Sequence, residues 1–179
     1  MPQDGQAMPL DPATDSPILP DLLSLSAEAT KALDGILEIA RQTVAARVTV
    51  AGRIDSALLE AEQTATHGLA WLATYAQALR QMQAWADRLD AEGRFGEMEA
   101  LLHQIAFGEY LWQVYGGLPM SQGEIVRLQD LGLSQEDQRG LMVPAVMTLC
   151  NEGNSQVART RLVALMRDGT ANATFGQSG

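Results

Sequence analysis

The chain has 179 residues, of which 12 are Lys or Arg and 22 are Asp or Glu, so its formal net charge is −10 at pH 7. A surplus of negative charge repels phosphate backbones and anionic lipid headgroups, and we therefore expect neither nucleic acid nor a membrane surface as a partner. Hydrophobic residues make up 46% of the sequence, which is ordinary for a globular protein and predicts one domain with a proper core.

Cysteine content and the N-terminal sequence both bear on the compartment. Cys150 is the one cysteine in the sequence, so no internal disulfide can form and no thiolate metal cluster is available. The N-terminal residues have neither the positive region nor the apolar region of a signal peptide. The apolar runs also fall well short of the ~20 residues that a membrane span needs. These features predict a cytoplasmic protein.

Apolar residues that recur every three or four positions predict two long helices in the first half of the chain. Residues 1–20 precede them and are rich in Pro, Asp, Gln and Ser without periodicity, which is typical of a disordered leader. The first helix is predicted over 26–48. The second is predicted over 55–91, with Asp55 as its N-cap and a candidate break at His67–Gly68.

One face of each long helix is predicted to be buried, because its apolar residues align on the helix surface. In the first helix these residues are Ala29, Leu33, Ile36, Leu37, Ala40 and Val44. In the second helix they are Leu69, Leu72, Tyr75, Ala76, Leu79, Met82, Ala86 and Leu89. We expect these faces to pack against other helices of the same chain.

In the second half of the chain, cap residues and apolar periodicity predict shorter helices. The helix predicted over 97–115 carries apolar side chains on two sides, which is typical of a helix that is central in a bundle or covered by a partner. The S-x-x-E pattern of Ser121 and Glu124 predicts a capping box and a short helix. Ser134 predicts the cap of another helix, which Pro144 must kink or split.

A last helix is predicted over 154–167 and is expected to stop at Gly169. Residues 170–179 have neither periodicity nor caps and are predicted to be a linker. No strand pattern and no internal repeat is evident. The predicted fold class is therefore all-α, a bundle of about five to six helices over 21–169. The last helix is expected to bury Val157, Leu162, Leu165 and Met166.

Residues that could carry chemistry are few. His67 and His103 belong to no metal-binding or catalytic motif, and a packed or semi-buried helix histidine is the favoured interpretation for both. Cys150 lies in an apolar stretch, which favours a buried thiol over a nucleophile. The acidic pairs Glu60–Glu62 and Glu97–Glu99 are most simply solvated faces and helix starts. The sequence therefore predicts no catalytic, cofactor-binding or metal-binding residue.

One segment has the composition of a protein interface. Between Phe107 and Arg127 the chain concentrates aromatic residues, Met and Arg around a tight GGLP turn, and these residue types are enriched in interfaces. Core packing explains the same residues about equally well. The candidate interface residues are Tyr110, Trp112, Tyr115, Met120, Glu124 and Arg127.

Four segments of the sequence resemble a known family. They are HGLAWLATY (67–75), GRFGEMEALL (93–102), GEY (108–110) and GGLPMSQGEIVR (116–127). Together they resemble the N-terminal extension of methylsuccinyl-CoA dehydrogenases, which are flavin enzymes of the ethylmalonyl-CoA pathway within the acyl-CoA dehydrogenase family. The resemblance extends from about Ser26 to the end of the chain.

The resemblance implies a longer parent enzyme. In such a parent, FAD accepts a hydride from the acyl-CoA, a glutamate of the catalytic core removes the α-proton, and electron-transferring flavoprotein reoxidises the flavin. The parent is expected to be a cytoplasmic homo-oligomer. The core that binds FAD is expected to follow Gly179, with 170–179 as the linker toward it, so the resemblance assigns no catalytic or cofactor role to any residue of this chain.

Three functional hypotheses follow. The first is a helical accessory domain that packs on an acyl-CoA dehydrogenase core or on a neighbouring subunit and has no chemistry of its own. The second is a free-standing interaction module that docks through the region from Tyr110 to Arg127. The third is an enzyme that uses His67 or His103, although no partner motif accompanies either residue.

Overall fold

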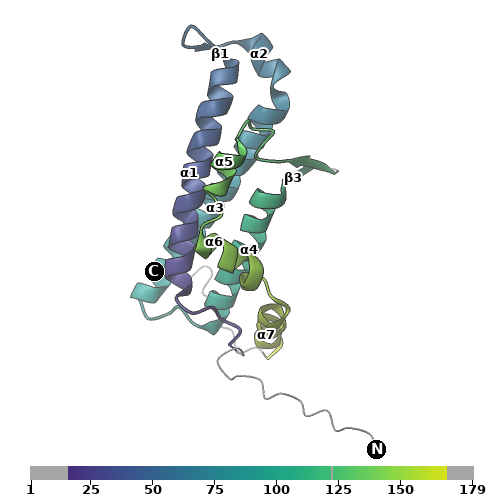
Figure 1. The fold of residues 1–179 in the computed structure, drawn as a ribbon. Helices are drawn as coiled ribbons and strands as arrows, with labels where there is room; N and C mark the ends of the chain where they lie inside the picture. Colours follow the sequence, from purple (N-terminus) through teal and green to yellow (C-terminus); the bar gives the residue numbers. More distant parts are fainter. Residues whose placement is uncertain (1–15, 122, 169–179) are drawn as a thin grey trace, which may run out of the picture.

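A computed structural model describes residues 16–121 and 123–168 of the chain (Figure 1). Within these residues the chain forms seven α-helices, one π-helix and two short β-hairpins. The predicted all-α class is confirmed, although the two hairpins were not predicted. Most of the predicted leader (1–15), the stop at Gly169 and the predicted linker (170–179) lie outside the described residues.

The two longest helices, α1 (Leu22–Val48) and α3 (Gln63–Ala91), run antiparallel and pack along their length (Figure 1). Each buries the stripe that its periodicity predicts, because every third or fourth side chain faces the other helix. In the predicted stripes Leu37, Leu69, Tyr75 and Met82 are half-buried, and the remaining residues are buried.

The far end of this helix pair carries a hairpin of β1 (Thr49–Val50) and β2 (Arg53–Ile54), followed by α2 (Ser56–Ala61). Asp55 caps α2 as predicted, because its carboxylate accepts hydrogen bonds of 3.0 Å from the backbone N–H groups of Ala57 and Leu58. Among the residues of α2, none is buried.

The predicted break at His67–Gly68 is wrong, since α2 and α3 are separated at Glu62. Gly68 lies inside α3 for a packing reason. A Cβ atom at this position would lie 2.4 Å from Cγ1 of Val126, so only glycine permits the close approach of that side chain.

Helix α4 (Glu97–Gly116) lies at the centre of the bundle and contacts α1, α3 and the C-terminal elements. Phe107, Leu111 and Val114 are buried on one side, and Leu101 is buried on another. The predicted apolar character on two sides thus corresponds to a helix with neighbours on both sides.

A hairpin follows α4 where the sequence predicted a capping box and a short helix. Strand β3 (Leu118–Ser121) pairs antiparallel with β4 (Glu124–Val126), and Leu118 lies opposite Val126. Both side chains are buried. The helix prediction is wrong because burial of this pair and the β-branched residues of β4 favour a strand, and tertiary packing overrides a local cap signal.

The C-terminal part begins with α5 (Gln135–Arg139) and continues through α6 (Pro144–Thr148) into the π-helix η2 (Leu149–Gly153). The side chain of Ser134 forms the predicted cap with Asp137. Pro144 stands in the first turn of α6, so it separates two helices as predicted. Helix α6 packs on α1, and η2 packs on α4.

Helix α7 (Gln156–Arg167) does not bury the residues that the sequence predicted. Val157 is 57% exposed and Met166 is 52% exposed, whereas Leu162 and Leu165 are half-buried. Among the residues of α7, the buried one is Ala158. The physical reason is that α7 packs on α4 and presents a small side chain to it, which leaves most of its apolar residues outside.

The predicted leader is also too long at its C-terminal end. The side-chain amide of Gln104 donates a hydrogen bond of 2.7 Å to the carbonyl oxygen of Pro17, and its oxygen accepts one of 3.0 Å from the backbone N–H of Leu19. Ile18 and Leu19 pack against the core. Residues 17–19 are therefore part of the folded domain.

Candidate functional site

The candidate interface residues lie on α4 and on the hairpin that follows it, in different environments. Tyr110 is half-buried, and its ring lies 4.9 Å from that of Tyr75 on α3. Trp112 and Tyr115 are 42% and 45% exposed, and their ring centroids are 5.9 Å apart. The indole N–H of Trp112 donates a hydrogen bond of 2.5 Å to the carbonyl oxygen of Cys150, which fixes the ring at the surface.

The remaining candidate interface residues come from the hairpin. Met120 and Glu124 line a hollow of about 390 Å³ between the hairpin and the start of α3, and His67 lines its other side. Arg127 is exposed just beyond β4. The structure therefore places the ring of Trp112 beside that of Tyr115, and it places Met120 and Glu124 at the same hollow. The ring of Tyr110 instead lies against that of Tyr75 on α3.

His67 is exposed, and its Nε2 atom accepts a hydrogen bond of 3.1 Å from the indole N–H of Trp71, one helical turn away. This contact lies on the surface of α3 and engages one of the two ring nitrogens. The hollow beside it contains one carboxylate, that of Glu124, among its lining residues. The lining also contains the hydroxyl of Thr64, whereas Nε2 of His67 is hydrogen-bonded to Trp71.

His103 lies in the core and is 0% exposed. Its Nε2 atom is 2.8 Å from Oγ of Ser26, and its ring lies 4.5 Å from that of Phe107 and 6.0 Å from that of Phe95. Burial lowers the pKa of His103 to about 4, because an apolar surrounding disfavours the charged ring. The ring is therefore neutral at pH 7 and closed to substrate, as predicted for a packed helix histidine.

Cys150 is buried in η2, and burial raises the pKa of its thiol to about 11. Because the thiolate is the reactive form, this thiol is inert at neutral pH. The predicted buried thiol is confirmed.

The acidic pairs behave less uniformly than predicted. Both carboxylate oxygens of Glu97 accept hydrogen bonds of 2.6 Å from Arg161, and this contact lowers the pKa of Glu97. Glu62 forms an ion pair of 3.3 Å with Arg47. Glu99 is 7% exposed, so the prediction of a solvated face is wrong for this residue, which lies on the inner side of the first turn of α4.

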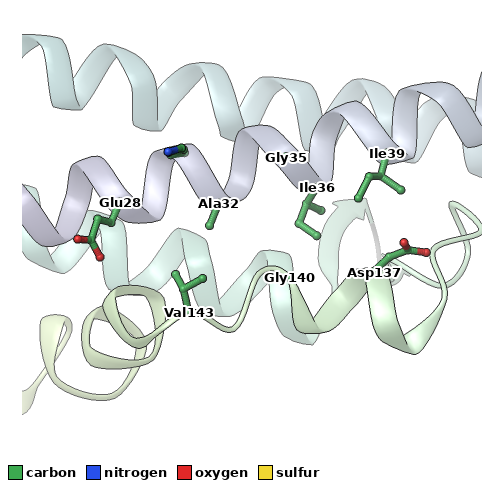
Figure 2. Close-up of a pocket in the computed structure, with 9 residues that line it drawn as sticks. Glu28, Ala32, Gly35, Ile36, Ile39, Asp137, Gly140 and Val143 are labelled. Carbon is green, nitrogen blue, oxygen red and sulfur yellow. The ribbon is translucent and has the colours of Figure 1, made fainter.

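A second hollow, of about 380 Å³, runs along α1 beside α5 and α6 (Figure 2). Figure 2 shows Ala32, Ile36 and Ile39 pointing from α1 toward the segment that carries Val143. Gly35 leaves the wall open, since a Cβ atom built there would have no neighbour within 4 Å. This hollow is an apolar groove.

Charged residues stand at the rim of the groove. Glu28 and Asp137 lie at its two ends in Figure 2, and Lys31 also lines it. Asp137 already accepts hydrogen bonds from the backbone N–H and the hydroxyl of Ser134, and these contacts lower its pKa. The groove suits an apolar group, because its floor offers no free polar partner.

Neither of these two hollows fits the FAD that the resemblance implies for a parent enzyme. A third hollow, of about 480 Å³, lies along α7 and is lined by Arg159 and Arg167 among others. The diphosphate of FAD requires backbone N–H groups at a helix start or several basic side chains. The apolar groove offers one lysine against two carboxylates, and the hollow at His67 offers Glu124 without any basic residue besides the histidine. Among the described residues, no group of three or more His, Cys, Asp or Glu is placed to hold a metal ion.

No helix in the described parts of the chain is both long enough and apolar enough to cross a membrane. No family model matches the sequence. The described chain is mostly helical, and its sequence is homologous to part of a CoA-thioester dehydrogenase.

The relative is (2S)-methylsuccinyl-CoA dehydrogenase of Cereibacter sphaeroides, which is 54% identical over 166 residues. The match covers 93% of this chain and 30% of the relative, so the chain spans less than a third of the length of that enzyme. The resemblance predicted from the four segments is confirmed.

Several features of the surface could not be found from the sequence. The apolar groove along α1 and the exposure of Val163 and Met166 on α7 are both determined by which elements cover each helix. A weak signal for the groove was present, because Ala32 and Gly35 are small residues beside Ile36 and Ile39. The polar contacts of Gln104 carried no sequence signal, since any helical glutamine has the same appearance.

Proposed function

We propose that this chain is a helical accessory domain of an FAD-dependent acyl-CoA dehydrogenase that resembles methylsuccinyl-CoA dehydrogenase. The observation that carries the proposal is the match of 93% of this chain to 30% of that enzyme. A region that aligns almost whole, but with a minor part of a larger enzyme, is best explained as one folded unit of it.

In this proposal the domain packs on the catalytic core or on a neighbouring subunit, and the reaction takes place elsewhere in the parent. The burial of His103 and Cys150, which keeps both side chains away from any substrate, supports this division. The parent would bind FAD, pass electrons to electron-transferring flavoprotein and form a homo-oligomer. Its substrate would be a methylsuccinyl-CoA thioester or a close analogue.

The test is a replacement in the intact enzyme. The matched region of the Cereibacter sphaeroides dehydrogenase is replaced by this chain, and FAD content and turnover of (2S)-methylsuccinyl-CoA are measured. We expect the hybrid to bind FAD and to turn over, and the chain by itself to be colourless. Flavin or turnover from the chain by itself, or a hybrid with neither, would contradict the proposal.

A second candidate function is a free-standing interaction module that docks through the region from Tyr110 to Arg127. The exposure of Trp112 (42%), Tyr115 (45%) and Ile125 (47%) favours it. Size-exclusion chromatography with light scattering and binding of an apolar dye test this alternative on the isolated chain. A monomer that binds no dye would argue against an exposed docking face.

A further inference from the structure

Helix α7 has an outward face that packing within the described chain leaves uncovered. Arg159, Val163 and Arg167 follow one another at intervals of four residues, so their side chains form one row on the helix surface. Met166 lies next to this row, three residues after Val163. Val163 is 51% exposed and Met166 is 52% exposed.

The charge of this face is opposite to that of the molecule. The chain has a net charge of −10, yet α7 contains three arginines and no Asp or Glu within Gln156–Arg167, and Asp168 follows as its C-cap. The guanidinium of Arg161 is already paired with Glu97 through two hydrogen bonds of 2.6 Å. Arg159 donates hydrogen bonds of 3.1 and 3.3 Å to the side-chain oxygens of Asn154 and Gln156, and within residues 16–121 and 123–168 it forms no ion pair.

The arrangement defines the chemistry of a partner. An apolar centre of Val163 and Met166 is flanked along the helix by Arg159 and Arg167, which are eight residues apart and thus about 12 Å along the axis. Exposed Met, Val and Arg on one helix face have the composition of an interface. Such a face is complementary to an apolar site with carboxylates on either side.

We propose that the outer face of α7 docks on the catalytic part of the parent dehydrogenase, at an apolar site flanked by carboxylates. This inference rests on the proposed function. The relative contains the polypeptide that would supply this site, since 70% of its length lies outside the match (100 − 30). A second copy of this chain offers similar chemistry, because Glu28 and Asp137 stand at the two ends of its apolar groove. Two chains that each carry −10 repel one another, however, and the parent is therefore the favoured occupant.

Hydrogen exchange measured on the isolated chain and on the hybrid enzyme described above tests the inference. We expect amides of α7 to exchange about tenfold or more slowly in the hybrid, because docking suppresses local opening of the helix. Amides of the β1–β2 hairpin serve as an internal reference and should be unchanged. Unchanged exchange in α7 with slowing at another face would overturn this inference and leave the proposed function standing. Unchanged exchange everywhere would overturn both.

A pair of matched double variants of the hybrid provides a second measurement. V163S/R167Q removes one exposed valine and one arginine from α7, and V50S/R53Q removes the same residue types from the β1–β2 hairpin, where Val50 is 55% exposed. We expect the first variant alone to lose the slowed exchange of α7 and to make the hybrid more sensitive to salt. Equal behaviour of the two variants would contradict the inference, and thermal unfolding of each isolated chain controls for loss of fold.

Discussion

Gln104 is a polar side chain with 0% exposure, and its hydrogen bonds go to two separate parts of the chain. It binds Pro17 and Leu19 in the N-terminal segment and donates a bond of 3.3 Å to the carbonyl oxygen of Gly153 in η2. Helix α4 is thereby hydrogen-bonded both to the segment that precedes α1 and to the π-helix. Removing the amide would leave three backbone groups without this partner.

We therefore expect Gln104→Met to lower the free energy of unfolding by about 2–4 kcal/mol, since buried polar groups left without partners cost more than the bonds themselves contribute. Gln81→Met on the exposed side of α3 is the control and should change the stability by less than about 0.5 kcal/mol. Urea denaturation measures both. Equal effects of the two variants would show that the contacts of Gln104 are dispensable.

His103 makes the stability of the domain depend on pH. Its pKa is about 4 in the folded chain, against about 6.5 when unfolded, so the unfolded chain binds the proton more readily. The stability that the neutral ring provides is fully present above pH 6.5 and is lost as the pH falls toward 4. The free energy of unfolding therefore falls as the pH falls, as expected for a histidine whose pKa is lowered by burial.

The expected loss from this one group is about 3 kcal/mol between pH 7 and pH 4. Because ordinary carboxylates begin to titrate at the lower end of this range, the wild type is compared with His103→Gln, which cannot be protonated there. Urea denaturation across this pH range should show a shallower decline for the variant. His67→Gln, at an exposed position, should follow the wild type, and a parallel decline for all three proteins would contradict the prediction.

At the scale of elements, α4 and η2 are in unusually close contact. A Cβ atom on Gly108 would lie 2.7 Å from the carbonyl oxygen of Leu149 and 2.9 Å from the backbone nitrogen of Asn154. Gly153 on the facing element is equally restricted, since its Cβ would lie 2.7 Å from the carbonyl oxygen of Gln104. Both glycines let two backbones approach each other.

We expect Gly108→Ala to destabilise the domain by about 1–3 kcal/mol, because backbone atoms cannot move aside for the new methyl group. Gly116→Ala in the same helix is the matched control, since its Cβ would have no neighbour within 4 Å. The control should be neutral or slightly stabilising. Thermal unfolding of both variants checks the prediction, and tolerance of alanine at both positions would contradict it.

The long elements could be predicted from the sequence, because a stripe of apolar residues at helical spacing has few other solutions. Asp55, Ser134 and Pro144 also acted as predicted, since their effects depend on the backbone of their own turn. Errors arose where a distant neighbour decides the outcome. The cap signal at Ser121 gave way to pairing of Leu118 with Val126, and α7 turned Ala158 inward.

The candidate site was predicted less completely than the fold. The sequence identified Trp112 and Tyr115, which are exposed and in contact, but it could not separate them from Tyr110, which faces α3. Adjacent aromatic residues on a helix point in different directions, and only the positions of neighbouring helices determine which become buried. Val157 and Met166 of α7 were predicted to be core, and they are exposed for the same reason.

Across the whole molecule, packing is unevenly distributed along the helix pair. The middle of α1 and α3 is enclosed by α4, α5 and α6, whereas the hairpin and α2 extend beyond these neighbours (Figure 1). Val50 and Ile54 are 55% and 70% exposed, and Leu58 and Leu59 are 37% and 40% exposed. With so little buried surface, this end has few contacts to oppose local unfolding.

Amides of residues 50–61 are therefore expected to exchange hydrogen at least about tenfold faster than those in the middle of α3. Mass spectrometry of peptides from the isolated chain measures this difference. The central residues Leu72, Ala76 and Leu79 are each 0% exposed and should define the slowest-exchanging segment. Equal protection along the whole helix pair would show that the far end is stabilised by contacts of another kind.

The apolar groove along α1 contains Lys31, which is the only lysine in the sequence. An amine-reactive fluorophore can therefore attach at two positions, the ε-amine of Lys31 and the α-amino group of the N-terminus. An α-amine is in general more acidic than a lysine ε-amine, so it can be blocked first near neutral pH. A dye placed afterwards on Lys31 would report by its emission on any molecule that enters the groove.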